Sequence, residues 1–296
     1  MNDSWIQSIL VPAAMFSLMF GMGLTLRVTD FRRIAAKPAA TMIGTLLQLV
    51  GLPLIGIALA LAFELQPLLA AGLVIVAACP GGMFSNMYVH FAGGNTALSV
   101  TLTASATMAT LFTLPLWVNG TLSYVGGGTD VQMPVLRTAL ELGGLTVLPI
   151  LIGMGFRSRR PEAMAFERWL TPGAAIVIVG AMVSEGLQRP ELPTAAARQS
   201  ALPVILFSLI TIATGLIVPA LARLPIRDTV TIAVELIVKN TLLGIVLAMR
   251  SLDFDAMIPI VVFSMIQTPA GLLILVVWRL LARFGWVEPP DAIAQA

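Results

Sequence analysis

Two ionisable residues four positions apart, Glu235 and Lys239, interrupt an otherwise apolar stretch that runs from Thr229 to Arg250. A carboxylate or an ammonium at membrane depth costs at least ~2.5 kcal/mol unless it faces a polar cavity or a partner. The pair therefore predicts an ion- or substrate-handling site. The alternative is a structural salt bridge along one helix, because glutamate four residues before lysine is the favourable order.

A second group of residues suited to cation chemistry lies earlier in the chain. Cys79-Pro80-Gly81-Gly82 interrupts an apolar run and is followed by Ser85 and Asn86. Proline removes a backbone donor and glycine weakens the helix, so we predict a broken helix here. Broken backbone at membrane depth is tolerated where it lines a cavity. Freed carbonyls with Ser85 and Asn86 would supply oxygen ligands for a hard cation, although interhelical hydrogen bonding is the alternative use.

The composition supplies the membrane setting for both groups. Of the 296 residues, 58% are hydrophobic and 11% are charged, against roughly 25% charged in soluble domains. An all-α polytopic membrane protein follows, with no nucleic-acid partner expected. Because a span needs about 20 apolar residues, the sequence predicts about nine spans in one integral membrane domain. They are 5–26, 38–63, 67–92 (broken), 95–118, 132–156, 167–187, 200–222, 228–250 (broken) and 255–282.

The distribution of basic residues predicts the orientation. With the N-terminus outside, twelve Lys and Arg residues fall on the cytoplasmic side and four on the external side. Positive charge accumulates on the cytoplasmic side, so we expect the N-terminus outside and the C-terminus in the cytoplasm of a multi-pass cell-membrane protein, the inner membrane in a bacterium. The cytoplasmic set is Arg27, Arg32, Arg33, Lys37, Arg157, Arg159, Arg160, Arg168, Arg223, Arg227, Arg279 and Arg283.

The two broken segments occupy comparable places in the two halves of the chain. Each is followed by a short polar turn and a long span. Interrupted segments in corresponding positions are typical of inverted-repeat secondary transporters whose site lies at the membrane midplane.

At these residues the chain resembles the bile acid:sodium symporter family of the wider bile/arsenite/riboflavin transporter group. The matching residues are Gly21-MGLTL-Arg27, Gln48 with Pro53, Cys79-PGG-Met83-Phe84-Ser85-Asn86, Gly94-Asn95-TALSV-Thr101, and Val234-Glu235 with Asn240. The resemblance implies a nine-helix form in which two discontinuous helices cross. It also implies a panel (about 5–63 and 167–222), a core (about 67–118 and 228–282) and a connecting segment, 132–156.

The resemblance also implies two sodium sites. The first would consist of Ser85, Asn86, Ser99, Thr103 and Glu235. The second would consist of Gln48, Glu235 and backbone oxygens at Leu236 and Val238, with Lys239 standing where the family usually has a glutamine ligand. The lysine suggests a tethered cation in place of the second Na⁺. A lysine in a low-dielectric site can also release its proton near neutral pH, so Lys239 could instead carry a coupling proton.

Residues beside the expected crossing bear on the substrate. The resemblance places Met83, Phe84, Asn240 and Gln267 there, with Met83 and Phe84 replacing small or hydroxylated residues and Gln267 standing where many members have histidine or another polar residue. We therefore expect symport of an organic anion or similar amphipathic solute, smaller or more apolar than a bile acid.

Other function classes are less consistent with the sequence. Metalloid efflux, as in arsenite carriers of the same group, is the alternative, since Cys79 offers a soft ligand. An enzyme is not expected, because the chain has one histidine and no metal-ligand or nucleophile constellation. We expect no cofactor beyond Na⁺ or H⁺, and no obligate protein partner beside the lipid bilayer.

Overall fold

The computed structural model describes residues 5–27, 38–125, 134–187 and 192–283, which are almost entirely helical. A single isolated bridge, between Gly81 and Lys239, is the one β-type pairing in the described part. The helices are η1 Ile6–Leu10, α2 Val11–Thr25, α4 Pro38–Leu46, η3 Leu47–Gly51, α5 Leu52–Ala62, α6 Pro67–Ala78, α7 Met83–Phe91, α8 Thr96–Val125, α9 Val135–Leu142, η4 Gly143–Val147, α10 Leu148–Arg159, η5 Pro161–Ala163, α11 Met164–Leu187, α12 Leu192–Leu221, α13 Ile226–Ile237, α14 Thr241–Ser251 and α15 Phe254–Arg283.

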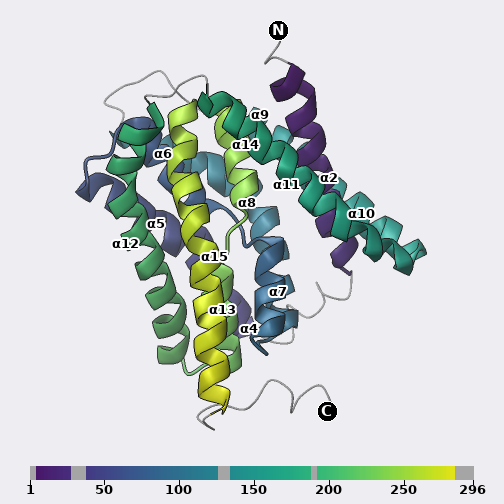
Figure 1. The fold of residues 1–296 in the computed structure, drawn as a ribbon. Helices are drawn as coiled ribbons and strands as arrows, with labels where there is room; N and C mark the ends of the chain where they lie inside the picture. The colour runs from purple at the N-terminus through teal and green to yellow at the C-terminus, as the bar shows by residue number, and fades with distance from the viewer. Residues whose placement is uncertain (1–4, 28–37, 126–133, 188–191, 284–296) are drawn as a thin grey trace.

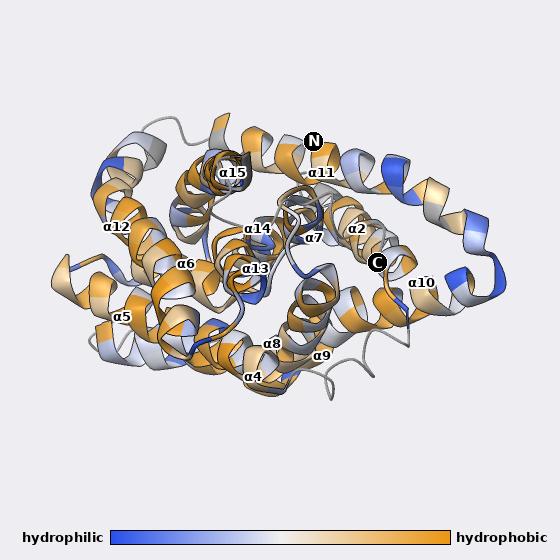
Figure 2. Cartoon of the chain, turned by 90° about the horizontal axis from the view of Figure 1, so that it is seen from below, coloured by the Kyte–Doolittle hydropathy of each residue, from blue (hydrophilic) through white to orange (hydrophobic). Residues whose placement is uncertain are grey.

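The all-α polytopic architecture is confirmed. In the described residues, seven continuous helical runs are long and apolar enough to cross a membrane, and each coincides with a predicted unbroken span. The two spans predicted to be broken are instead pairs of shorter helices, α6 with α7 and α13 with α14. Hydrophobic residues cover most outward faces, and hydrophilic residues gather at helix ends, notably the turn between α10 and α11 (Figure 2). The count of nine crossings stays a prediction.

Three π-helical segments each end two residues before a proline. η1 precedes Pro12, η3 precedes Pro53 and η4 precedes Pro149. Proline has no N–H to donate to the carbonyl four residues earlier, and a wider turn accommodates the missing bond. In η3 the carbonyl left without this bond is Leu49, and it accepts a hydrogen bond from Trp117 Nε1 at 2.9 Å. The wider turn also carries Gln48.

The helices pack in two groups that differ from the expected panel and core. α2 packs on α10 and α11, and Figure 1 shows these three on one flank. A β-carbon at Gly23 would overlap the Ile150 backbone, and one at Gly153 would overlap the Phe20 carbonyl, so α2 and α10 lie in close contact. The α10 part of the expected connecting segment, 132–156, therefore packs on α2, whereas its α9 part packs on α8.

The second group contains the expected core together with two helices assigned to the panel. α5 packs on α6, and α12 packs on α13 and α15. The expected panel ranges 38–63 and 200–222 therefore contact the core. Chain order did not reveal this, because helix packing in a membrane depends on small residues that permit close approach between segments distant in sequence.

Candidate functional site

The two broken segments meet in the middle of the molecule. Gly82 N–H donates to the Val238 carbonyl at 2.9 Å, and Asn240 N–H donates to the Pro80 carbonyl at 2.9 Å. These bonds pair the link between α6 and α7 with the link between α13 and α14 (Figure 1). Backbone groups that have no helical partner at one break thus form hydrogen bonds with the backbone at the other break. The predicted crossing of two discontinuous helices is present in the structure.

The second break has its own local cause. α13 ends at Ile237, and Asn240 caps α14, its Oδ1 accepting the Leu243 N–H at 3.1 Å. Asparagine is a strong N-cap residue, so Asn240 was the sequence signal that a new helix starts here. Glu235 and Lys239 therefore do not share one helical face. The described residues contain no ion pair between them, so the salt-bridge interpretation was wrong.

The Glu235 carboxylate is fully buried among hydroxyl groups. Ser85 Oγ lies 2.7 Å from Oε1, and Thr103 Oγ1 lies 3.1 Å from Oε1 and 3.0 Å from Oε2. Ser99 Oγ also contacts Oε1, and it lies 2.7 Å from Asn86 Oδ1. The structure thus brings together all five residues expected at the first sodium site, from α7, α8 and α13.

This cluster holds more acceptor oxygens than protons. Ser85 Oγ lies 2.5 Å from the Gly82 carbonyl as well as near Glu235, and Ser99 Oγ lies near both Asn86 Oδ1 and Glu235. A hydroxyl has one proton and can donate to only one acceptor at a time. With Glu235 ionised and Oδ1 of Asn86 facing Ser99, some oxygen pairs are therefore in contact without a proton between them. A bound cation would resolve these contacts.

Space for the carboxylate depends on Gly81. A β-carbon there would overlap Glu235 Oε2 and would lie 3.2 Å from Thr103 Oγ1. The Pro-Gly-Gly sequence therefore does more than break a helix. It also leaves the volume in which the acid and its hydroxyl partners meet.

The residues expected at the second sodium site are only partly brought together. Gln48 Nε2 donates to the Glu235 carbonyl at 3.3 Å, and its buried Oε1 has no partner. The Lys239 ammonium instead donates to the carbonyls of Cys79 at 2.9 Å and Ala77 at 3.4 Å. The Val238 carbonyl is used by the crossing, and Leu236 is buried beside Glu235 in the last turn of α13. Lys239 thus caps the C-terminal end of α6, where a helix dipole favours a cation.

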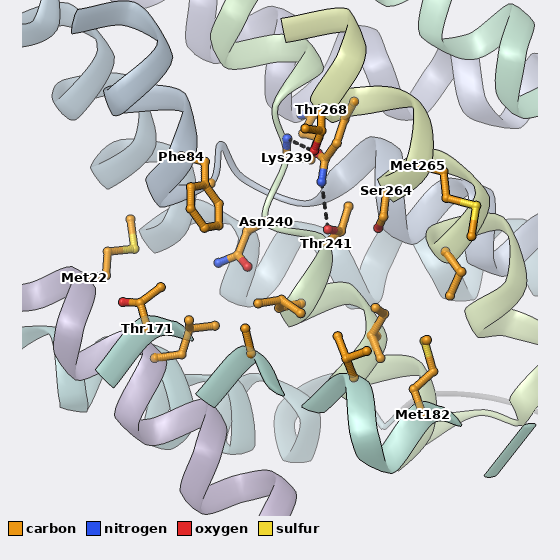
Figure 3. Close-up of a pocket in the computed structure, with 18 of the residues that line it drawn as sticks. Met22, Phe84, Thr171, Met182, Lys239, Asn240, Thr241, Ser264, Met265 and Thr268 are labelled. Atoms are coloured by element: carbon orange, nitrogen blue, oxygen red, sulfur yellow. Dashed lines mark hydrogen bonds between the residues drawn. The ribbon is translucent and has the colours of Figure 1, made fainter. Parts of the chain in front are cut away.

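A cavity of about 390 Å³ opens beside the crossing (Figure 3). Phe84, Asn240 and Gln267 line it, as expected of crossover residues, whereas the side chain of Met83 lies outside the described part of the structure. Its other lining residues are Leu18, Met19, Met22, Gly82, Thr171, Ala175, Val179, Met182, Lys239, Thr241, Leu242, Ile245, Val261, Ser264, Met265 and Thr268.

Both packing groups contribute to this cavity. α2 and α11 form one wall, and α7, α14 and α15 form the other. The sequence interpretation missed Thr171, Ser264 and Thr268. The spacing of Ser264 and Thr268, four residues apart on one helical face with Gln267, was an available signal.

Comparison with known proteins gives a consistent assignment. A model of the sodium bile acid symporter family matches residues 12–188. A probable sodium/metabolite cotransporter, BASS2 of the chloroplast, from Oryza sativa subsp. japonica is 27% identical over 93% of this chain and 65% of its own length. An uncharacterized sodium-dependent transporter, YocS, from Bacillus subtilis (strain 168) is 29% identical over 93% of this chain and 84% of its own.

An ileal sodium/bile acid cotransporter from Oryctolagus cuniculus is 31% identical, over 56% of this chain and 48% of its own length. The chain thus spans about two thirds of the rice relative and about half of the rabbit relative. These matches are to transporters and not to enzymes. With the family model covering more than half of the chain, the protein belongs to the sodium bile acid symporter family.

Proposed function

We propose that the chain is a secondary active symporter that couples the movement of a small organic anion, or a similar amphipathic solute, to Na⁺. The single observation that carries this proposal is the buried Glu235 carboxylate in a cluster of oxygens with too few protons. The relatives named as sodium-dependent support the choice of ion. One Na⁺ moving with a monoanion carries no net charge, so the Na⁺ concentration gradient alone would drive it; a cotransported proton would add about 2.3 kcal/mol per 100 mV of membrane potential.

In this proposal Na⁺ binds at the first site and joins three helices. Ser85 and Asn86 come from α7, Ser99 and Thr103 from α8, and Glu235 from α13. Unwound backbone and helix C-terminal ends at such crossings are suited to cations, whereas half-helix N-termini are suited to anions. A bound ion would therefore fix the crossing in the geometry that presents the cavity to the solute.

The second sodium site is modified in this proposal, with the Lys239 ammonium as a tethered cation. It lies on the Cys79 and Ala77 carbonyls, at the negative end of α6, and so supplies positive charge beside the crossing without a second Na⁺. Gln48 Oε1, buried and without a partner, remains available next to the Glu235 carbonyl. Transport would then use one Na⁺ per cycle, or one Na⁺ with a proton carried by Lys239.

The lining of the cavity supports an anionic solute with an apolar body. Among the described residues no acidic side chain lines it, and the N-terminal ends of α7 and α14 reach it at Gly82 and Asn240. Helix N-termini favour negative charge, while Met22, Met182 and other apolar residues form the walls. Ligand pockets span roughly 300–1,000 Å³, so about 390 Å³ favours a solute smaller than a bile acid.

Alternating access would arise between the two packing groups, because the cavity lies between them. α2, α10 and α11 would shift against the helices that carry the crossing. We also propose the N-terminus outside and the C-terminus in the cytoplasm. The described chain starts at one end of the molecule with α2 and leaves at the opposite end with α15, which supports termini on opposite sides (Figure 1).

Uptake into proteoliposomes tests the proposal. Radiolabelled small carboxylates should accumulate when Na⁺ is higher outside, and should not accumulate in choline chloride. A screen of carboxylates by thermal shift, with and without Na⁺, would choose the solute, since a ligand of the folded state raises its melting temperature. Equal uptake in both salts would contradict sodium coupling. Taurocholate transport as fast as that of small carboxylates would contradict the proposed solute size.

The metalloid-carrier alternative is not favoured. The family match is to sodium bile acid symporters, and the Cys79 thiol is fully buried while its carbonyl accepts the Lys239 ammonium.

A further inference from the structure

The side-chain amide of Gln267 forms hydrogen bonds through both its oxygen and its nitrogen to the break between α13 and α14. Its Oε1 accepts the backbone N–H of Lys239 at 2.9 Å, and its Nε2 donates to Thr241 Oγ1 at 2.9 Å. Figure 3 draws both hydrogen bonds as dashed lines. One side chain from α15 therefore holds the start and the end of residues 239–241.

The same amide faces the cavity. Gln267, Lys239 and Thr241 all line it, and the Gln267 side chain is only partly buried. One turn later, a β-carbon at Gly271 would lie 3.1 Å from Val238 Cγ2, so α15 packs directly on the break. A solute in the cavity thus meets a group that already holds the backbone of the crossing.

Residues 238–240 are also connected by backbone hydrogen bonds to the last turn of α13, which carries Glu235. The Val238 carbonyl accepts the Gly82 N–H, and the Val238 N–H donates to the Val234 carbonyl in the last turn of α13. Gln48 holds the Glu235 carbonyl in that turn. A displacement of residues 238–240 would therefore move the end of α13 that carries the carboxylate.

We infer that Gln267 couples occupancy of the cavity to cation binding at Glu235, by holding the backbone of residues 238–241 between them. It acts through that backbone and is a positioning residue. This inference rests on the proposed function, since it names how the solute and the sodium site communicate. The coupling must be reciprocal. The factor by which bound Na⁺ changes the affinity for the solute is also the factor by which bound solute changes the affinity for Na⁺.

Sodium titrations of the purified full chain provide the first test, with the melting temperature as the readout and choline replacing Na⁺ at constant ionic strength. Gln267→Met keeps the length of the side chain and removes both hydrogen bonds. We expect the midpoint of the Na⁺ response to rise about three- to tenfold, as for loss of ordinary intramolecular hydrogen bonds. Ser264→Ala is the matched control. Ser264 lines the same cavity on the same helix, but its hydroxyl donates to Ile260, so the midpoint should not change.

A second variant keeps the test informative if Gln267→Met folds poorly. Thr241→Val removes only the partner of Nε2 and should raise the midpoint less than Gln267→Met does. The double variant should match Gln267→Met, because interacting residues are not additive. A wild-type midpoint in both single variants would overturn the inference.

A cavity readout tests the coupling itself. Ser264→Cys places a thiol in the cavity, and N-ethylmaleimide is the probe. The unaltered chain, whose Cys79 is buried, serves as the blank. We expect Na⁺ to change the labelling rate when residue 267 is glutamine and to change it at least threefold less after Gln267→Met. An equal sodium effect in both backgrounds, or none in either, would overturn the inference. Absence of any Na⁺ response in the melting temperature of the unaltered chain would instead refute the proposed function.

Discussion

The two sides of Glu235 offer a cation very different surroundings. On one side Ser85, Ser99 and Thr103 direct hydroxyl oxygens at the carboxylate. On the other side Gln48 contacts the Glu235 backbone, and Lys239 occupies the end of α6 with its own ammonium. The first side has excess acceptors, while the second already holds a covalently attached charge.

This difference shows how a lysine at one side of Glu235 could replace an exchangeable cation with a covalently attached one. An oxygen cluster with unmatched acceptors requires a cation from solution, so its occupancy can follow the Na⁺ gradient. An ammonium on a side chain is covalently attached and cannot be exchanged for Na⁺ from solution. In our proposal only the first side therefore contributes Na⁺ to the transport cycle, and the second side supplies a fixed or protonatable charge.

The largest expected effect comes from removing the charge on the oxygen-rich side. Glu235→Gln should weaken Na⁺ binding by at least roughly 100-fold, because removing one member of a buried charged pair costs about 3–5 kcal/mol. Sodium-dependent thermal shift and sodium-driven uptake both measure this loss. Glu64→Gln, at an exposed glutamate, is the matched control. Sodium binding that survives Glu235→Gln would remove the carboxylate from the site.

The next effect concerns the space beside the carboxylate. Gly81→Ala should destabilise the fold by about 1–3 kcal/mol, as overpacking does, and should weaken Na⁺ binding because the new methyl group displaces Glu235 Oε2. Gly120→Ala is the control, since a β-carbon at that helical glycine meets nothing within 4 Å. It should stabilise α8 slightly. Equal sodium midpoints for the two alanine variants, measured by thermal shift, would show that Gly81 has no role in the site.

Lys239→Gln examines the second side directly. Glutamine supplies an amide oxygen in place of the ammonium, so we expect a second Na⁺ to bind and the Hill coefficient for Na⁺ to rise from about one towards two. Flux of ²²Na⁺ per solute in proteoliposomes measures the stoichiometry, and uptake at several pH values tests proton coupling. Unchanged stoichiometry together with an unchanged pH profile would refute both roles proposed for Lys239. Lys37→Gln, at a position expected outside the membrane, is the control substitution.

The smallest effect is expected from the wide turn that carries Gln48. Trp117→Phe removes the donor to the Leu49 carbonyl, to which Pro53 cannot donate the usual helical hydrogen bond. The unfolding free energy should fall by about 1 kcal/mol, with at most a small change in the sodium midpoint. Chemical unfolding in detergent measures the first value, and thermal shift the second. A large sodium defect would show that the position of Gln48 governs the ion site more than we propose.

Several features could be predicted from the sequence for local reasons. The break at Pro80 is a covalent property of proline, and the apolar runs fix the spans by their length. The resemblance selected Ser85, Asn86, Ser99, Thr103 and Glu235, and all five meet in the structure. The break after Ile237 was harder to explain locally, because only the capping asparagine Asn240 signals it.

Other features depend on contacts that the sequence pattern does not contain. The spacing of Glu235 and Lys239 suggested one helical face, but the crossing with Gly81 and Gly82 separates them. The spacing also did not indicate which acceptors the Lys239 ammonium uses, namely the Cys79 and Ala77 carbonyls. Grouping of α5 and α12 with the crossing helices likewise follows from tertiary packing and not from chain order.

The sequence by itself determined that the chain is a helical membrane protein with interrupted segments and an intramembrane acid and amine. These are consequences of local backbone chemistry and of the cost of charge in lipid. Only the tertiary structure decided which oxygens surround Glu235, where Lys239 points and which residues enclose the cavity. Those outcomes depend on close approach between helices distant in sequence, which is set by side-chain volume and by backbone groups that must find partners where each helix is broken.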